Sequence, residues 1–195
     1  MLRRAVLFSM LVMTAAACSQ NEPPAEPQPP VLPDTAGEGA RRAAEQARQD
    51  SIARAREEER MRGERAAAET ARARATLEEM VFFDYDESEL RADAQETLAR
   101  KVTILRANPD VTLRITGHAD ERGSIEYNLA LGLRRANAVS EYLSGFGISA
   151  SRFTTETMGE DRPLDPGSNE SAWARNRRGE FAITGGGDQL VTSGS

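Results

Sequence analysis

The segment from residue 41 to residue 79 restricts the fold most, because it has no proline, a single glycine, Gly63, and a dense mixture of alanine, arginine and glutamate. These strong helix formers predict one long helix. Its large apolar residues are only Ile52, Met61 and Leu77. They form no repeating seam for a tight coiled coil, so the pattern favours a solvated single helix. Weak association between such helices, or a charged stalk without regular structure, stays open.

Residues 18–40, before this segment, are rich in proline and poor in apolar bulk. That composition favours an extended chain over packing and predicts a linker. The chain starts with Arg3 and Arg4, an apolar run over residues 5–13, and small residues up to Cys18. A basic start, a short apolar run and small residues are typical of an export signal, which we place at residues 1–17.

Cys18 is the only cysteine, and it follows the small residues directly. The segment Thr14-Ala15-Ala16-Ala17-Cys18 resembles a bacterial lipobox, although Ala15 stands where leucine is usual. The resemblance implies that Cys18 carries lipid, palmitate included, and becomes the mature N-terminus. Ser19 after it resembles outer-membrane sorting. The alternative is a secreted protein with one free thiol, which an oxidising export compartment disfavours.

The charge balance and residue counts exclude several classes of function. The chain has 25 basic and 31 acidic residues and a net charge of -6, so no nucleic-acid-binding surface is predicted. One cysteine cannot form an internal disulfide or a cysteine-rich zinc site. With a single histidine, His118, zinc clusters built on histidine, Ser-His triads and Cys-His dyads are excluded too. We expect no metal, no cofactor and no catalysis.

Residues 80–184 alternate strand and helix signals. Val81-Phe82-Phe83 starts a short strand, and residues 111–116 alternate apolar and polar side chains as a half-buried strand does. Apolar residues at helical spacing predict one helix with a buried face of Ala94, Leu98, Val102 and Leu105. A second helix, from about residue 125 to residue 146, has a face of Ala136, Val139, Leu143 and Phe146. Residues 153–158 and 179–183 supply two more strands.

We therefore predict an α/β (α+β) sandwich of β-α-β-α-β-β order, in which two main helices pack on one mixed sheet. The predicted organisation is a signal peptide over residues 1–17, a lipid-anchored linker over 18–40 and a charged helical spacer over 41–79. The domain follows over residues 80–184. Residues 185–195 are predicted to form a flexible tail.

Charged side chains gather where the predicted second strand ends. Asp120 is an anionic acceptor suited to an ammonium group, and Arg135 carries a planar donor fork that matches a carboxylate. A helix that begins near residue 124 places Leu131 and Arg135 on one face, near the loop that bears Asp120. Such a site would select an amine and a carboxylate on one carbon. The other interpretation is that Asp120 caps the helix and Arg135 is a solvated surface residue.

Several motifs in this region resemble the peptidoglycan-associated lipoproteins of the OmpA-like domain family. The resemblance covers residues 80–184, in order and with matching gaps. It rests on Phe83-Asp84-Tyr85-Asp86, Gly117-His118-Ala119-Asp120-Glu121-Arg122-Gly123, Tyr127-Asn128-Leu129-Ala130-Leu131-Gly132, Arg134-Arg135-Ala136-Asn137-Ala138-Val139, Tyr142-Leu143 and Asn176-Arg177-Arg178.

The resemblance implies a pocket that binds the diaminopimelate of the peptidoglycan stem peptide without cutting it. Asp120 and Arg135 are then the central pair, one for the free amine and one for the carboxylate. Tyr85 and Asp86 line the entrance. Arg122 and Leu131 complete the walls.

Other residues of these motifs are expected to have structural roles. His118 is expected to be a hydrogen-bonding side chain at the strand end, and Trp173 a core or lid anchor. Asn176-Arg177-Arg178 is expected to brace the last strand. The implied protein partners are the Tol proteins of the envelope, similar to TolB and TolA, with a role in envelope integrity and cell division.

Three rival functions have to be weighed against a wall-binding outer-membrane lipoprotein. A secreted, unanchored wall-binding adaptor differs only in its N-terminus. A wall hydrolase needs a pair of carboxylates, which could come from Asp84, Asp86, Asp120, Glu121 and Glu126. A stator-like wall anchor of the flagellar motor needs a transmembrane helix, and the sequence has no run of about 18 apolar residues.

Overall fold

The computed structural model describes residues 35–192, and contacts divide the chain into a unit over residues 1–48 and a unit over residues 49–195. In chain order the elements are α1 (Thr35–Glu78), β1 (Val81–Phe82), α2 (Ala92–Ala107), β2 (Thr112–His118), α3 (Ile125–Gly145), the short 3-10 helix η1 (Ala150–Arg152), β3 (Phe153–Gly159), α4 (Glu170–Asn176) and β4 (Arg178–Gly185). The predicted order of strands and main helices is confirmed, and α4 is an addition to it.

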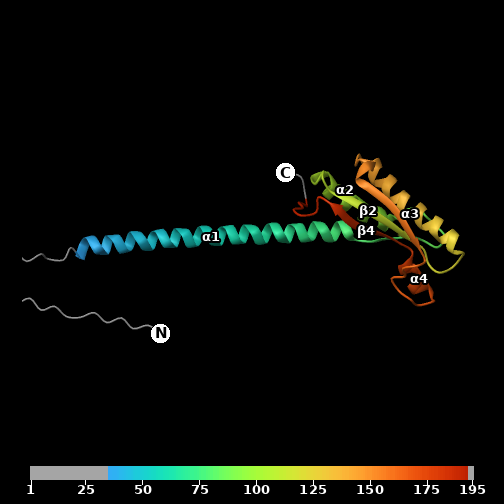
Figure 1. The fold of residues 1–195 in the computed structure, drawn as a ribbon, viewed down its shortest axis with the longest axis horizontal. Helices are drawn as coiled ribbons and strands as arrows, with labels where there is room; N and C mark the ends of the chain where they lie inside the picture. Colours follow the sequence, from blue (N-terminus) through green and yellow to red (C-terminus); the bar gives the residue numbers. More distant parts are fainter. Residues whose placement is uncertain (1–34, 193–195) are drawn as a thin grey trace, which may run out of the picture. The chain divides into compact units, whose positions relative to one another are not determined.

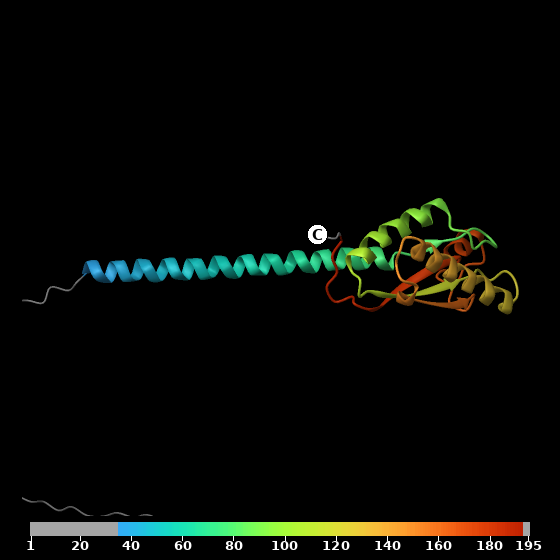
Figure 2. The ribbon, with the colours of Figure 1, turned by 90° about the horizontal axis from the view of Figure 1, so that it is seen from above.

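The four strands form one mixed sheet in the order β1-β4-β2-β3. β2 pairs in parallel with β3 and antiparallel with β4, and β1 pairs antiparallel with β4. The last strand therefore lies inside the sheet. Figures 1 and 2 show α2 and α3 side by side on one face of the sheet, which confirms the predicted fold class.

The core lies between this sheet face and the two helices. The predicted face of α2 is buried, and so are Ala136, Val139 and Leu143 of α3. Phe146 is 43% exposed, which contradicts its predicted place on the buried face. The reason is that α3 ends at Gly145, and the chain turns at Gly147 with a φ of +83°, so Phe146 no longer follows the helical period.

Two glycines set how closely α3 approaches the sheet. A Cβ on Gly117 of β2 would lie 1.8 Å from the carbonyl oxygen of Gly132 in α3. A Cβ on Gly132 would lie 2.3 Å from Oγ1 of Thr157 in β3. No side chain fits at either position without moving the helix. This close approach fixes the height of α3 over the end of β2, where the predicted site residues gather.

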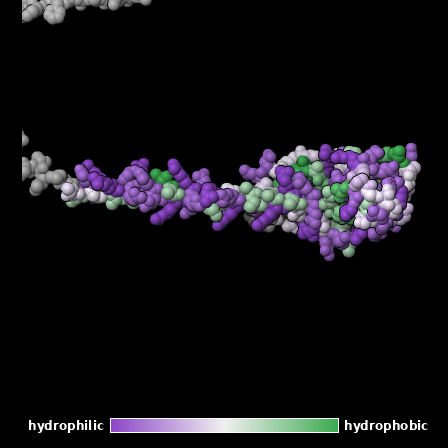
Figure 3. Space-filling view, turned by 90° about the horizontal axis from the view of Figure 1, so that it is seen from below, coloured by the Kyte–Doolittle hydropathy of each residue, from purple (hydrophilic) through white to green (hydrophobic). Residues whose placement is uncertain are grey.

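The long helix α1 confirms the predicted long charged helix, but its bounds differ at both ends from the predicted residues 41–79. It begins at Thr35, inside the predicted linker, because the sequence has no proline between Pro33 and Pro109, and because Glu38 in the first turn pairs with Arg42 at 3.5 Å. Arg60 pairs with both Glu57 and Glu64 at 2.5 Å. Figure 3 shows a predominantly hydrophilic surface along this helix.

The last turns of α1 belong to the domain, so the predicted boundary at residue 80 is too late. Ala73 and Leu77 are fully buried and pack into the same core as α2 and the sheet. Two apolar residues at a spacing of four put one stripe of the helix against the core. Residues 38–68 of the helix are exposed to solvent, as their composition predicts.

The C-terminal residues that the structure describes are not the flexible tail that we predicted. Leu190 is only 2% exposed, and its backbone exchanges two hydrogen bonds with the Thr70 hydroxyl, at 3.2 and 3.3 Å. Val191 exchanges two more with the Asn108 side chain, at 3.1 and 2.8 Å. Residues 187–192 thus form a strap, because one buried leucine and these paired amides fix them to α1 and α2.

The predictions for the signal peptide, for Cys18 and for residues 18–34 of the linker lie outside the described residues. Within residues 35–192, no helix is both long enough and apolar enough to cross a membrane.

Candidate functional site

The candidate site lies where β2 ends and α3 begins. Ser124 precedes α3 with extended backbone, and its hydroxyl accepts a hydrogen bond from the backbone N–H of Tyr127 at 3.2 Å. This N-cap satisfies one of the free N–H groups at the helix start and fixes where α3 begins. Leu131 and Arg135 then follow one turn apart on the face that borders the loop with Asp120. The cap is Ser124, so the interpretation of Asp120 as the helix cap is wrong.

Arg135 is fully buried, which excludes the interpretation that it is a solvated surface residue. Its guanidinium donates from Nε to the carbonyl of Glu87 at 2.8 Å, from Nη1 to that of His118 at 2.7 Å, and from Nη2 to that of Asp84 at 3.1 Å. It therefore joins the end of β2 to the loop after β1. A guanidinium has five N–H groups, so two remain for a ligand. Burial lowers the pKa of Arg135 to about 10, and the side chain stays cationic at neutral pH.

Asp120 is 4% exposed and is held by two arginines. Arg122 donates to it from its backbone N at 3.1 Å, from Nε at 3.0 Å and from Nη2 at 2.8 Å. Arg177 adds a bond from Nη1 at 3.2 Å. Burial alone would raise the pKa of Asp120, but these hydrogen bonds outweigh it and lower the pKa. Asp120 is an anion at neutral pH.

Tyr85 and Asp86 come from the loop after β1 and face the same space. Asp86 has a left-handed backbone with a φ of +58°, which is uncommon for a residue other than glycine. Its carboxylate accepts a hydrogen bond from the hydroxyl of Tyr127 in α3. Tyr85 is 57% exposed, so it lies at the rim and not in the core. A strained residue with a charged side chain at a cavity is typical of a functional position.

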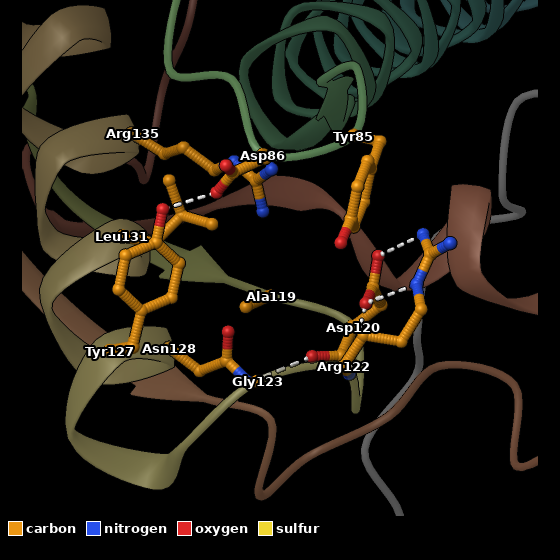
Figure 4. A pocket seen from close by; sticks show the side chains of 10 residues that line it. All are labelled: Tyr85, Asp86, Ala119, Asp120, Arg122, Gly123, Tyr127, Asn128, Leu131 and Arg135. Carbon is orange, nitrogen blue, oxygen red and sulfur yellow. Dashed lines mark hydrogen bonds and ion pairs between the residues drawn. The ribbon is translucent and has the colours of Figure 1, made fainter.

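These side chains enclose a cavity of about 110 Å³. Figure 4 shows the Tyr127–Asp86 pair on one side and the Arg122–Asp120 pair on the other. Two carboxylates and two guanidinium groups therefore face one small space. Its lining residues are Tyr85, Asp86, Ala119, Asp120, Arg122, Gly123, Tyr127, Asn128, Leu131 and Arg135.

Known proteins match this part of the chain in sequence and fold. Residues 82–177 match the model of the OmpA family. The crystal structure of the peptidoglycan-associated lipoprotein from Burkholderia pseudomallei is 35% identical, with a TM-score of 0.53, over 54% of this chain and 89% of that one.

The chain belongs to the OmpA family.

Curated relatives of this OmpA-family chain carry the name peptidoglycan-associated lipoprotein. The protein from Agrobacterium fabrum is 44% identical over 107 residues, which are 55% of this chain and 60% of the relative. The protein from Haemophilus influenzae is 38% identical over 102 residues, or 52% of this chain and 67% of the relative. The chain thus spans about 60% of the length of the first of these relatives.

A more distant structure shares the fold alone. The C-terminal domain of MotB from Helicobacter pylori is 18% identical with a TM-score of 0.51, over 54% of this chain and 84% of that one.

All six predicted site residues of the OmpA-family domain line the cavity. They come from the loop after β1, the loop after β2 and the helix α3, and the structure brings them together. Sequence reasoning missed Ala119, Gly123, Tyr127 and Asn128 as lining residues, although all four lie inside the quoted motifs. It also missed that Arg177, which lies between α4 and β4, reaches Asp120.

Arg178 has the structural role that we expected, whereas the expectation that His118 is a hydrogen-bonding side chain is wrong, because neither of its buried ring nitrogens has a hydrogen-bond partner within residues 35–192. Arg178 braces β4 through Glu180 at 2.6 Å and through the carbonyl of Arg162 at 3.0 Å. Trp173 packs on the guanidinium of Arg122 at 4.2 Å and donates to Glu121 at 3.0 Å, so it is a wall of the site region. His118 is buried, and its Nε2 lies 3.4 Å from a carboxylate oxygen of Glu180, away from the cavity.

Within residues 35–192, no three His, Cys, Asp or Glu side chains lie in a group that could hold a metal ion.

Proposed function

We propose that this OmpA-family domain binds peptidoglycan noncovalently by taking up one end of a diaminopimelate residue in the cavity. The observation that carries the proposal is the convergence of Asp86, Asp120, Arg122 and Arg135 on a space of about 110 Å³. A free amino acid end group carries one ammonium and one carboxylate, and paired anions and planar cations suit both. The relatives named peptidoglycan-associated lipoprotein support the same ligand class.

The lining side chains would contact different groups of the ligand. Arg135 offers the two N–H groups that it does not donate to backbone carbonyls, and a carboxylate accepts such a pair well. Asp86 and Asp120 offer the anionic acceptors for the ammonium. Leu131, which is nearly buried, gives the methylene groups of the ligand an apolar wall. Tyr85 at the rim covers the entrance.

The position in the cell belongs to the same proposal. We propose that the protein lies at the periplasmic face of the outer membrane and is anchored there by lipid on Cys18. The linker and α1 would connect this anchor to the domain. The domain would then tether the outer membrane to the wall, within the Tol-Pal system. Radiolabelled palmitate is expected to enter the full chain and not Cys18→Ser. Absence of label from the full chain would remove the lipid anchor and leave the secreted adaptor.

The test of wall binding is a pull-down with purified sacculi. Asp86→Asn removes one charge while asparagine still tolerates the left-handed backbone, and Asp120→Asn removes the other. Each variant is expected to lose retention by about tenfold or more, since a charged hydrogen bond contributes roughly 1.5–3 kcal/mol. Glu96→Gln, an exposed charge change on α2, is the matched control and should bind like the wild type. Unchanged retention of both site variants would refute the site.

Arg135→Ala is a poor test, because it also removes three hydrogen bonds to the backbone. Asp120 is unsuited to be the general acid of a hydrolase, since a general acid needs a raised pKa and the pKa of Asp120 is lowered by its hydrogen bonds to arginine. Release of soluble muropeptides from sacculi by the wild type would overturn the proposed binding-only function.

A further inference from the structure

The carboxylate of Asp120 has no acceptor capacity left for a ligand. Its Oδ1 accepts from the backbone N and Nε of Arg122, and its Oδ2 accepts from Nη2 of Arg122 and Nη1 of Arg177. A carboxylate offers about four lone-pair sites, so these four donors fill it. An ammonium group can bind Asp120 only after one of them leaves.

Arg177 is not free to leave. Its side chain is 6% exposed, and besides Asp120 it donates to the carbonyl of Phe83 at 3.1 Å and to Glu170 at 2.8 Å. The backbone N–H of Arg122 is fixed by the loop itself. Moving either group would require rearrangement of the chain around β1, the loop after β2 and α4.

The Arg122 side chain has both room and a second partner. It is 28% exposed, and its Nη1 lies 3.4 Å from a carboxylate oxygen of the exposed Glu170. Its guanidinium stacks between the rings of Tyr85, at 4.0 Å, and Trp173, at 4.2 Å. Figure 4 shows Tyr85 beside the Asp120–Arg122 pair. The guanidinium can therefore slide between the rings toward Glu170 and still keep a counter-ion and two aromatic faces.

We propose that Arg122 is a displaceable internal cation that occupies Asp120 until the ammonium group of the ligand replaces it. This inference rests on the proposed function and gives Arg122 a different part from that of a direct ligand contact. Its consequence is selectivity for an unsubstituted amine. An acylated amine carries no charge, so it cannot compensate Asp120 once Arg122 has left.

Trp173 makes the displacement observable, because it is the only tryptophan of the chain and its ring lies on the Arg122 guanidinium. Withdrawal of that cation changes the surroundings of the indole. We therefore expect the tryptophan fluorescence of the full chain to change in a saturable way on titration with meso-diaminopimelic acid. The change should be absent from Arg122→Gln.

The deciding experiment is calorimetric titration of the full chain and its variants with meso-diaminopimelic acid. Arg122→Gln removes the competing cation, so its affinity is expected to be about three- to tenfold higher than that of the wild type. Arg122→Lys keeps the charge and should stay closer to the wild type. Arg114→Gln removes an arginine that pairs with Glu156, outside the cavity, and is the matched control. Circular dichroism verifies that each variant is folded.

The outcomes separate the two proposals. If the wild type binds and Asp120→Asn does not, while Arg122→Gln binds equally or more weakly than the wild type, the displacement is wrong and Arg122 is a ligand contact or a spectator. If diaminopimelic acid that is acylated on both amines binds as well as the free compound, the displacement is wrong too. If the wild type binds neither compound, the proposed function fails and the displacement with it.

Discussion

Lys101, the only lysine, provides the most exacting test of how α1 is attached to the domain. It lies in α2 with no exposed surface, and its ammonium donates to the carbonyls of Thr76 at 2.7 Å, Leu77 at 2.8 Å and Glu79 at 2.6 Å. It also lies 3.9 Å above the ring of Phe181. The last carbonyls of a helix lack partners within the helix, so this side chain supplies them from outside. Lys101→Met keeps an unbranched side chain that is one atom shorter, and it removes every donor.

The expected loss follows from the burial of the three carbonyls. The bond to Leu77 is buried, and a buried carbonyl left without a partner costs roughly 1–3 kcal/mol. The bonds to Thr76 and Glu79 are partly buried, so water replaces much of each, and we assign about 0.5 kcal/mol to each. The total is a loss of about 2–4 kcal/mol in the free energy of unfolding. At about 3 °C per kcal/mol, Tm falls by roughly 6–12 °C.

The assay is urea unfolding followed by circular dichroism at about pH 6. Burial lowers the pKa of Lys101 to about 7, with Glu79 opposing the shift, so at pH 6 the side chain carries all three donors. Hydrogen exchange should show that residues 73–78 lose protection more than β2 does. Glu96→Met on the exposed side of α2 is the control, within about 0.5 kcal/mol of the wild type. Equal stability of Lys101→Met and the wild type, with unchanged exchange in α1, would refute the reasoning.

Three further predictions concern stability and titration. Gly132→Ala should lower the free energy of urea unfolding by about 2 kcal/mol or more, because its Cβ would lie 2.3 Å from Thr157 Oγ1. The control Gly145→Ala, with nothing within 4 Å of its Cβ, should be neutral or slightly stabilising. Equal effects of the two substitutions would contradict the close approach of α3 to the sheet. Leu190→Ala should lower the free energy of unfolding by about 2–4 kcal/mol and expose the end of α1 to hydrogen exchange. If this loss is no larger than that of the control Val191→Ala, the strap does not stabilise the domain. Burial lowers the pKa of His118 to about 4; nearby Arg178 and Arg162 lower it too, and Glu180 opposes the shift. The NMR titration of His118 should therefore have its midpoint near pH 4. Since the unfolded histidine binds its proton below about pH 6.5, stability should fall from there toward pH 4; a midpoint near 6.5 would contradict the burial.

The residues that give the site its chemistry could be found from the sequence because they lie near one another along the chain. Asp120 follows a strand directly, and Arg135 lies on the helix that the loop leads into, so their proximity follows from local geometry. Tyr85 and Asp86 came only from the resemblance, since nothing local brings the loop after β1 to α3. Arg135 itself makes that connection, through the carbonyls of Asp84 and Glu87.

The parts that sequence reasoning missed depend on tertiary contacts. Arg177 reaches Asp120 only because β4 lies inside the sheet, between β1 and β2. Leu190 lies in a polar, glycine-rich segment, and it is buried against the end of α1. The composition of that helix predicts exposure to solvent along its whole length. The helix α4 carried a local signal, because Asn169 caps it by accepting from the backbone N–H of Ala172 at 3.1 Å.

The central claim is that the cavity recognises the amine and the carboxylate of one end group together. The most direct measurement is calorimetric titration of the full chain with a soluble stem peptide that ends in meso-diaminopimelate, and with the same peptide ending in lysine. We predict saturable binding of the first and at least about tenfold weaker binding of the second, because lysine offers Arg135 no carboxylate at that end. Equal binding of the two peptides, or binding of neither, would contradict the account.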